Sequence, residues 1–128
     1  SSSVIGVLAQ RLVRSICEKC SEPYVPDREA LWRAGCDPEE SEHITFYHGR
    51  GCDACHRTGY KGRVGIFELF SMSEGISRLV NKEAPTHEIR TLAREEGMHT
   101  LQEDAMEKVR QGGTTVDEVL RVIASGWW

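Results

Sequence analysis

The chain has 128 residues, 39% of them hydrophobic, which is enough for one small domain with a real hydrophobic core. Its 16 basic and 20 acidic residues give a net charge of -4, so it lacks the positive surface that binds nucleic acids. No apolar run reaches the roughly 18 residues that a membrane span needs, so any membrane association is expected to run through partner proteins.

Residues 3–16 form the first segment, which we expect to be a buried helix. Apolar residues recur in it at every fourth position: Val4, Leu8, Leu12 and Ile16. This spacing is typical of one face of a helix that packs against other structure. We therefore interpret residues 1–16 as the end of a larger domain.

The segment 17–63 is irregular, because prolines and glycines interrupt the spacing of its apolar residues. Asp27 is placed to cap a short helix over residues 28–34. Residues 44–47 and 64–70 are rich in β-branched and aromatic side chains, which favours two short strands. We expect these two strands to pair with each other.

Two Cys-x-x-Cys turns lie in this segment, Cys17-Glu-Lys-Cys20 and Cys52-Asp-Ala-Cys55. Each such turn points two thiolates at one ion, and two turns complete the four soft ligands of a tetrahedral Zn²⁺. The start of the chain shows no secretory signal pattern, which indicates a reducing compartment, where paired Cys-x-x-Cys sequences favour metal over disulfides. We predict a cytoplasmic protein with one structural zinc site made by these four cysteines.

Two disulfides, four unrelated buried thiols and a thioredoxin-like redox pair are the alternatives for these cysteines. The redox alternative is disfavoured, because a redox Cys-x-x-Cys begins a helix that follows a strand. His43, His48 and His56 are near enough in sequence to compete as ligands, but four cysteines already fill a closed site. The fifth cysteine, Cys36, is expected to be a small buried apolar residue.

The second half of the chain, residues 64–128, is expected to form a small helical bundle. Three capping-box patterns mark helix starts: Ser71-x-x-Glu74, Thr100-x-x-Glu103 and Thr115-x-x-Glu118. Glycines stand where helices should stop: Gly97, Gly112-Gly113 and Gly126. Together with the short strands, these helices predict an α+β fold class.

No motif predicts catalysis by this chain. It lacks the G-x-x-x-x-G-K-[ST] loop that cradles a nucleotide phosphate, and it has no hydrolase or metalloprotease motif. Arg57, Lys61 and Arg63 form the one concentrated basic patch, which is either a solvated face or a docking surface for an acidic partner.

Five motifs follow one another in order along the chain. They are Leu8-Ala-Gln-Arg-Leu-Val-Arg14 before Cys17, Gly51-Cys-x-x-Cys-x-x-Thr-Gly-Tyr-x-Gly-Arg63, Gly65-Ile-Phe-Glu-Leu69, Gly97-Met-x-Thr-Leu101 and Thr114-Thr-x-x-Glu-Val-Leu-Arg121. This series resembles the bacterial secretion and pilus-assembly ATPases, the family of the type II secretion ATPase GspE and the type IV pilus ATPase PilB. The resemblance implies that residues 1–16 end a RecA-like ATPase core, 17–63 form a tetracysteine metal module, and 64–128 form a helical C-terminal subdomain.

The resemblance also implies a parent ATPase that works as a hexamer and holds ATP and Mg²⁺ upstream of this chain. That parent would drive type II secretion or pilus assembly, with the zinc module passing on its motion. Its implied partners are the inner-membrane platform and cytoplasmic-domain proteins of the machine, with no nucleic acid and no direct membrane insertion. The protein would then lie in the cytoplasm, peripheral to the inner membrane. Gly113 and the tail at residues 126–128 depart from the family pattern.

A free-standing DnaJ-like zinc-ribbon module that binds proteins is the alternative function. The chain matches most of the Cys-x-x-Cys-x-Gly-x-Gly element from Cys52 to Gly59, but Arg57 occupies the first glycine position and the element occurs once. A zinc-finger nucleic-acid binder is disfavoured by the isoelectric point of about 5.7.

Overall fold

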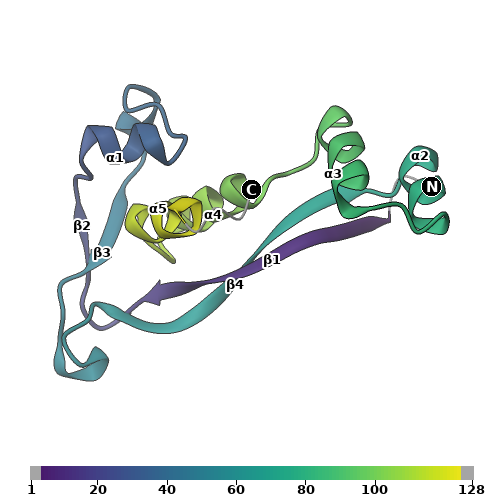
Figure 1. The fold of residues 1–128 in the computed structure, drawn as a ribbon. Coiled ribbons are helices and arrows are strands. Elements are labelled where there is room, and N and C mark those ends of the chain that lie inside the picture. The colour runs from purple at the N-terminus through teal and green to yellow at the C-terminus, as the bar shows by residue number, and fades with distance from the viewer. Residues whose placement is uncertain (1–3, 125–128) are drawn as a thin grey trace. The chain divides into compact units, whose positions relative to one another are not determined.

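The computed structural model describes residues 4–124 and contains both strands and helices (Figure 1). In chain order the elements are β1 (Ile5–Ile16), β2 (Ser21–Tyr24), α1 (Arg28–Arg33), the 3-10 helix η1 (Glu40–His43), β3 (Phe46–Gly49), the 3-10 helix η2 (Asp53–Cys55), β4 (Tyr60–Ser71), α2 (Glu74–Asn81), α3 (Thr86–Glu95), α4 (Leu101–Arg110) and α5 (Val116–Ala124). The expected mixture of α and β structure is confirmed. Within residues 4–124, every helix is too short or too polar to cross a membrane.

The strands pair as two separate two-stranded sheets. The long strands β1 and β4 form one sheet, and the short strands β2 and β3 form the other. β2 and β3 are antiparallel, with Ser21 opposite Gly49. The strand residues expected at 44–47 and 64–70 fall largely in β3 and β4, but the prediction that these strands pair with each other is wrong. Local composition identifies strand residues, whereas the choice of partner depends on the whole chain.

Strand β1 stands where a helix was expected, so the prediction of an N-terminal helix is wrong. A spacing of four residues is also a multiple of the two-residue period of a strand, so it cannot separate the two structures. Five β-branched residues favour the strand: Val4, Ile5, Val7, Val13 and Ile16. Ala9 and Val13, four residues apart, are both buried in β1.

The chain folds into two compact units. The first consists of the residues up to Gln10 together with Phe67–Leu101, and the second consists of Arg11–Ile66 together with the residues from Gln102 onwards. These units cut across the three segments 1–16, 17–63 and 64–128, whose boundaries stay a prediction. Helices α2 and α3 belong to the first unit, whereas α5 and nearly all of α4 belong to the second. The expectation of a single helical bundle is therefore corrected.

The first unit has its own apolar core. Phe70, Ile76, Ala93 and Met98 are buried in it, with Leu8, Met72, Ile89 and Leu92 packed against them. The start of α2 differs from the expected capping box, because the Ser73 hydroxyl, and not that of Ser71, accepts the Ile76 N–H. Gly97 follows α3 with φ of +86°, as its place in the sequence predicted.

A buried carboxylate, Glu68 on β4, joins the strand to Arg90 and Leu101 within the first unit. It is 1% exposed, and its Oε2 pairs with the Arg90 guanidinium of α3. Its Oε1 accepts the N–H of Leu101, the first residue of α4, at 3.5 Å. Because a buried carboxylate needs partners for its charge, this geometry fixes the position of Arg90 and the start of α4 relative to the strand.

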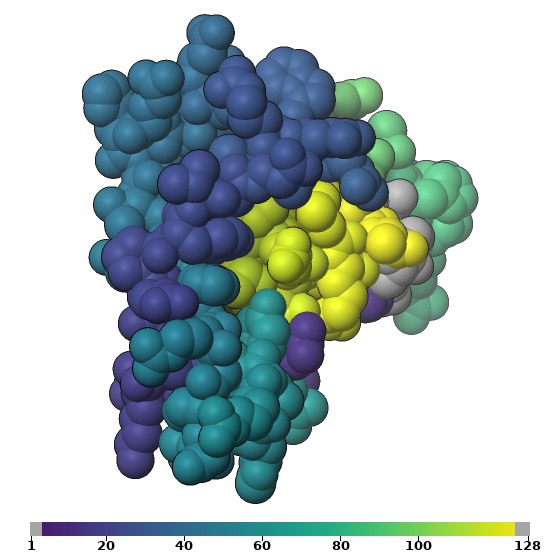
Figure 2. All heavy atoms as spheres, turned by 90° about the vertical axis from the view of Figure 1, so that its left-hand side faces the viewer, coloured from purple at the N-terminus to yellow at the C-terminus, as the bar shows by residue number. Residues whose placement is uncertain are grey.

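In the second unit α5 contributes a row of buried valines to the core. Val116, Val119 and Val122 are fully or almost fully buried. Helix α1 contacts α5, and Figure 2 shows the blue segment that contains α1 lying against the yellow of α5. The helix expected at residues 28–34 is confirmed as α1, although Asp27 makes no side-chain capping hydrogen bond. Residues 125–128, which include the Trp127–Trp128 tail and Gly126, lie outside the described residues.

Candidate metal centre

The four cysteines of the two Cys-x-x-Cys turns form one cluster. Their Sγ atoms all lie within 4.8 Å of one another. The Sγ atoms are 3.8 Å apart in the pairs Cys17–Cys52, Cys20–Cys55 and Cys52–Cys55. Zn–S bonds of about 2.3 Å in a tetrahedron place neighbouring sulfurs about 3.8 Å apart. The four residues are therefore positioned to hold one metal ion.

The sulfur distances do not fit the alternative of two disulfides. A disulfide bond is about 2.05 Å long, far shorter than the separations in this cluster. All four cysteines are free thiols, as is Cys36. Cys17, Cys20 and Cys55 are buried and Cys52 is half-buried, so the four thiols share one enclosed position and are not unrelated.

The cluster lies where all four strands begin or end. Cys17 directly follows β1, Cys20 directly precedes β2, and Cys52 and Cys55 lie in the connection from β3 to β4. Figure 1 shows both connections at the same end of the sheet formed by β2 and β3. A metal held here would tie together the ends of both sheets.

Backbone N–H groups point at two of the sulfurs. Gly51 donates to Cys20 Sγ at 3.3 Å, while Cys52 and Gly59 donate to Cys55 Sγ at 3.3 and 3.2 Å. Burial raises the pKa of Cys55, but the N–H donors of Cys52 and Gly59 and the neighbouring thiols outweigh burial and lower it to about 6. One sulfur of the cluster is thus prepared to be a thiolate, the form that binds metals.

The pKa of the Cys20 thiol shifts in the opposite direction, and burial is the main cause. It raises the pKa of Cys20 to about 11, because the single donor, Gly51, does not offset burial and the neighbouring thiols. Without a cation, four thiols this close cannot all ionise, since like charges raise one another's pKa. A divalent ion at the centre would relieve this conflict.

Two glycines permit the close backbone contact on which the cluster rests. A Cβ on Gly49 would lie 2.0 Å from the carbonyl oxygen of Gly59, and one on Gly59 would lie 2.5 Å from that of Gly49. The same Gly59 carbonyl accepts the N–H of Cys17 at 2.9 Å. Sequence analysis missed Gly49, which shows its importance only when the two loops meet.

The other sequence candidates lie outside the cluster, which contains only cysteines among residues 4–124. His48 pairs with Glu22 at 3.1 Å and stacks on Tyr24 in the β2–β3 hairpin. His43 ends η1, and His56 follows η2 with an exposed side chain. Cys36 is buried, and burial raises the pKa of its thiol, as fits the small apolar residue that was expected.

The basic patch beyond the second turn is exposed but partly neutralised. Arg57 forms an ion pair with Asp53 at 2.8 Å, with both side chains largely in solvent. Lys61 and Arg63 are exposed on β4. This geometry favours a solvated face over a docking surface for an acidic partner.

Glu118 is a buried group that sequence analysis misjudged, since it was expected to close a capping box. Its N–H does bond to the Thr115 hydroxyl, as a cap requires. Its carboxylate, 1% exposed, instead accepts from the backbone N–H and guanidinium of Arg14 at 2.6 and 3.1 Å and from Arg121 at 3.0 and 3.1 Å. Burial raises the pKa of Glu118, but Arg121 and Arg14 outweigh it and lower it to about 2.

This carboxylate links two motifs that lie about a hundred residues apart in sequence. Arg14 ends the first motif, and Glu118 lies in the last. The Arg14 guanidinium also lies 4.1 Å from the centre of the Tyr60 ring, and the Tyr60 hydroxyl bonds to Thr115 Oγ1 at 2.8 Å. The network fixes β1, β4 and α5 relative to one another near the cysteines.

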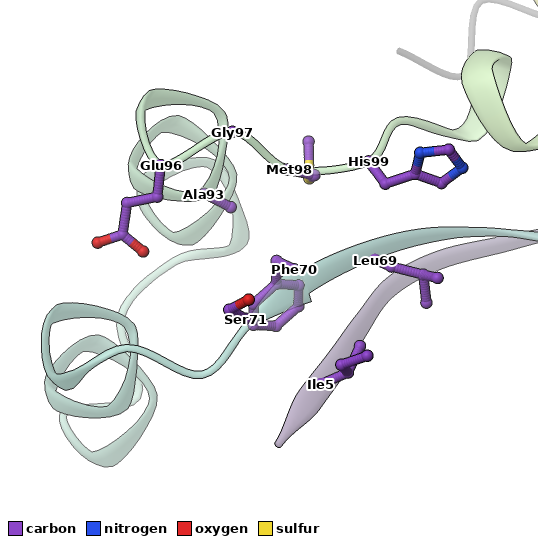
Figure 3. A pocket seen from close by; sticks show the side chains of 9 residues that line it. All are labelled: Ile5, Leu69, Phe70, Ser71, Ala93, Glu96, Gly97, Met98 and His99. Atoms are coloured by element: carbon purple, nitrogen blue, oxygen red, sulfur yellow. The ribbon is translucent and has the colours of Figure 1, made fainter. Parts of the chain in front are cut away.

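A separate hollow in the first unit offers no comparable chemistry. It has a volume of about 240 Å³ and lies beside Phe70 and Met98. Figure 3 shows its polar residues Glu96 and His99 on opposite sides, with their side chains directed apart. Because its polar groups do not converge, the cysteine cluster is the better candidate site.

Comparison with known proteins connects this cluster to a family. A family model described as Type II/IV secretion system protein matches residues 1–121. The type IV pilus assembly ATPase PilB of Thermus thermophilus is 44% identical over 120 residues, which cover 94% of this chain and 14% of that protein. The type II secretion system protein E of Pseudomonas aeruginosa is 43% identical over 122 residues, covering 95% of this chain and 24% of that protein.

A further relative is the type II secretion system ATPase E of Vibrio cholerae, 40% identical over 122 residues, 95% of this chain and 24% of that protein. The chain thus spans only about a quarter or less of the length of these relatives. The matches run through both Cys-x-x-Cys turns and the Arg14–Glu118 network. The chain therefore belongs to the family of type II/IV secretion system proteins, together with the type II secretion and type IV pilus assembly ATPases.

Proposed function

We propose that this chain is the zinc-binding part of a secretion or pilus-assembly ATPase and that it passes ATP-driven motion of the motor on to protein transport. The observation that carries the proposal is the set of 3.8 Å sulfur separations, which suit a tetrahedral ion coordinated by four thiolates. Family membership supports the motor, and it favours the secretion ATPases over the DnaJ-like alternative.

The donor set suits zinc in a structural role. Four thiolates form a soft, closed shell, with no position left for water or a substrate. The N–H donors to the sulfurs of Cys20 and Cys55 would offset part of the negative charge of a tetrathiolate centre. The ion would therefore supply folding energy and rigidity, while catalysis would belong to another part of the parent protein.

The place of the cluster in the fold supports a coupling role. The ends of β1, β2, β3 and β4 meet at the cysteines, so one ion would hold both sheets in a fixed arrangement. Among residues 4–124, the one apolar side chain packed against this cluster besides the cysteines is the partly buried Ala54. Without metal, this junction would lose its main source of stability, and a movement of one sheet would not be transmitted to the other.

The rest of the proposal concerns the parent protein. The relatives carry the names of ATPases, and a hexameric parent would bind ATP and Mg²⁺ in its RecA-like core. Its partners would be the inner-membrane platform and cytoplasmic-domain proteins of the machine, which would place it in the cytoplasm, peripheral to the inner membrane. The chain alone should give a flat calorimetric titration with Mg-ATP, since it has no phosphate-binding loop.

Metal analysis is the first test. The chain, purified without chelator, should contain about one equivalent of zinc, with sulfur as the ligand by X-ray absorption. Less than about half an equivalent would contradict the zinc site.

The second test replaces one ligand in the full-length parent by Cys52→Ser. Secretion or piliation should be lost, while nucleotide affinity should be retained. Cys36→Ser is the matched control, because Cys36 is a buried thiol outside the cluster, and it should retain both. Retained transport without metal would refute the coupling role. Lost nucleotide affinity would instead show that the ion holds the whole protein together.

A further inference from the structure

We infer that the outer side of the segment between β2 and β3 is a docking surface for a basic amphipathic segment of a partner protein. We call it the acidic–aromatic face and define it by Val25, Glu29, Trp32, Asp37, Glu39 and Glu42. The basic patch beside the second Cys-x-x-Cys turn is a different surface. The acidic–aromatic face carries negative charge and includes exposed apolar side chains. It also does not depend on the identity of the metal.

The segment that carries this face is anchored on its inner side. Helix α1 contacts α5, and Ala34, which follows α1, is fully buried. The Gln102 side chain of α4 donates to the carbonyl of Ala34, just after α1, at 2.7 Å. A partner would therefore meet a surface that is already positioned, which lowers the entropic cost of binding.

The outer side leaves large apolar groups in solvent. Trp32 is 68% exposed and Val25 is 93% exposed. Single exposed apolar residues are common, but tryptophan is a residue type that often dominates binding energy at interfaces. Trp32 and Val25 each border a hollow of this segment, so the surface offers a partner apolar contacts.

Two hollows lie beside these residues. One, of about 480 Å³, is lined by Trp32, Glu29 and Asp37, and the other, of about 230 Å³, is lined by Val25 and Leu31. Arg28 and Pro38 line both hollows, so the two are adjacent. The surface can therefore receive side chains and is not flat.

The charge of the face selects the partner. Residues 25–44 contain six acidic and two basic residues, a net of -4 that equals the net charge of the whole chain. Glu29, Glu39 and Glu42 are exposed, and among residues 4–124 none of them forms a salt bridge. Such carboxylates attract lysine and arginine and repel anionic lipid and nucleic acid.

The exposed apolar side chains and the exposed carboxylates of the face together define the occupant. Aliphatic or aromatic side chains would cover Trp32 and enter the hollows, and flanking lysine or arginine side chains would face the free carboxylates. A helix with an apolar and a basic side presents both at once. A second copy of this chain fits less well, because its exposed basic patch already pairs Arg57 with Asp53.

Nuclear magnetic resonance of the ¹⁵N-labelled 128-residue chain tests the surface. The probe is a designed helical peptide of about 18 residues with leucine on one side and lysine on the other. The Trp32 indole N–H and the amides of residues 25–44 should shift on titration. A scrambled peptide of the same composition should bind at least about tenfold more weakly, since it lacks the apolar side.

Two variants and two controls separate docking from general charge attraction. Trp32→Ala should weaken binding at least about tenfold, whereas Leu12→Ala, at another exposed apolar position, should change it less than about threefold. The triple change Glu29→Lys, Glu39→Lys and Glu42→Lys should also weaken binding at least about tenfold. Its control changes three exposed glutamates elsewhere to lysine: Glu83, Glu88 and Glu95.

The outcomes decide the inference. Equal weakening by both triple variants, or shifts spread over the whole chain, would overturn it, because either result means unspecific attraction by net charge. Self-association in sedimentation velocity that Trp32→Ala abolishes would also overturn it, since the occupant would then be a second copy. Because Trp32 is mostly in solvent, its replacement should leave the circular dichroism spectrum unchanged.

Discussion

The cysteine cluster and the core of the first unit are held together in opposite ways. Phe70, Ile76, Ala93 and Met98 form an apolar core that needs no cofactor. At the cysteines, the packed residues are the thiols themselves, and among residues 4–124 the one other apolar side chain in this cluster is the partly buried Ala54. One region is therefore stabilised by the burial of apolar surface, and the other would depend on a bound ion. The following experiments, in order of expected effect, test this contrast.

Removal of the metal is expected to have the largest effect. Structural zinc sites contribute on the order of 10 kcal/mol to the folding of their surroundings, so a strong chelator should unfold the loops at the cysteines. Hydrogen exchange followed by mass spectrometry should show lost protection in residues 17–63 and retained protection in 74–98. Equal loss in both would show that the two regions fold as one and would end the contrast.

The reverse experiment removes apolar volume from the first unit. Ile76→Ala deletes a fully buried side chain and should cost about 3 kcal/mol of unfolding free energy. Protection should fall in residues 74–98, while the zinc content and the protection around the cysteines stay unchanged. Loss of zinc in this variant would contradict the independence of the two regions.

Glu118 stabilises the second unit by a third means, a buried charge network. Glu118→Ala leaves Arg14 and Arg121 without their shared carboxylate and should cost about 3 kcal/mol, measured by urea unfolding. Glu107→Ala, which breaks a half-exposed pair with Arg110, is the control and should cost less than about 1 kcal/mol.

The low pKa of Glu118 predicts a pH dependence. Because its pKa in the folded protein, about 2, lies below the ordinary value of 4.5, Glu118 contributes its full stability above pH 4.5. That contribution is lost as the pH falls from 4.5 to 2. Acid also protonates metal ligands, so the measurement is the difference in stability between the native chain and Glu118→Gln. This difference should shrink over that range, and a constant difference would show that Glu118 does not titrate there.

The helix cap of α2 gives the smallest effect. Ser73→Ala removes the hydroxyl that accepts the Ile76 N–H and should cost about 1 kcal/mol. Ser71→Ala, at the position that the capping-box pattern selected, should cost less than about 0.5 kcal/mol. Thermal unfolding of the two variants distinguishes the cap in the structure from the one expected from sequence.

Several features of this protein could be predicted from short stretches of sequence. The two Cys-x-x-Cys turns predicted a cluster of four thiols, and the structure brings those four together. Thr115 and Gly97 marked the start of one helix and the end of another. The ordered motifs predicted the family that the comparisons show. Each turn and each helix signal depends on residues a few positions apart, whose geometry is set by the local backbone, and the need of a metal for four ligands predicted that the two turns meet.

The tertiary structure alone decided the remaining features. A spacing of four residues fits a helix and a strand equally, and the pairing of β1 with β4 made residues 5–16 a strand. The sequence pattern alone allows Glu118 to cap its helix. In the fold, its carboxylate instead accepts a hydrogen bond from Arg14, which lies near the other end of the chain. Gly49 became essential only where its backbone meets Gly59. Each of these outcomes depends on contacts between distant residues, and local sequence patterns carry no information about which distant residues will meet.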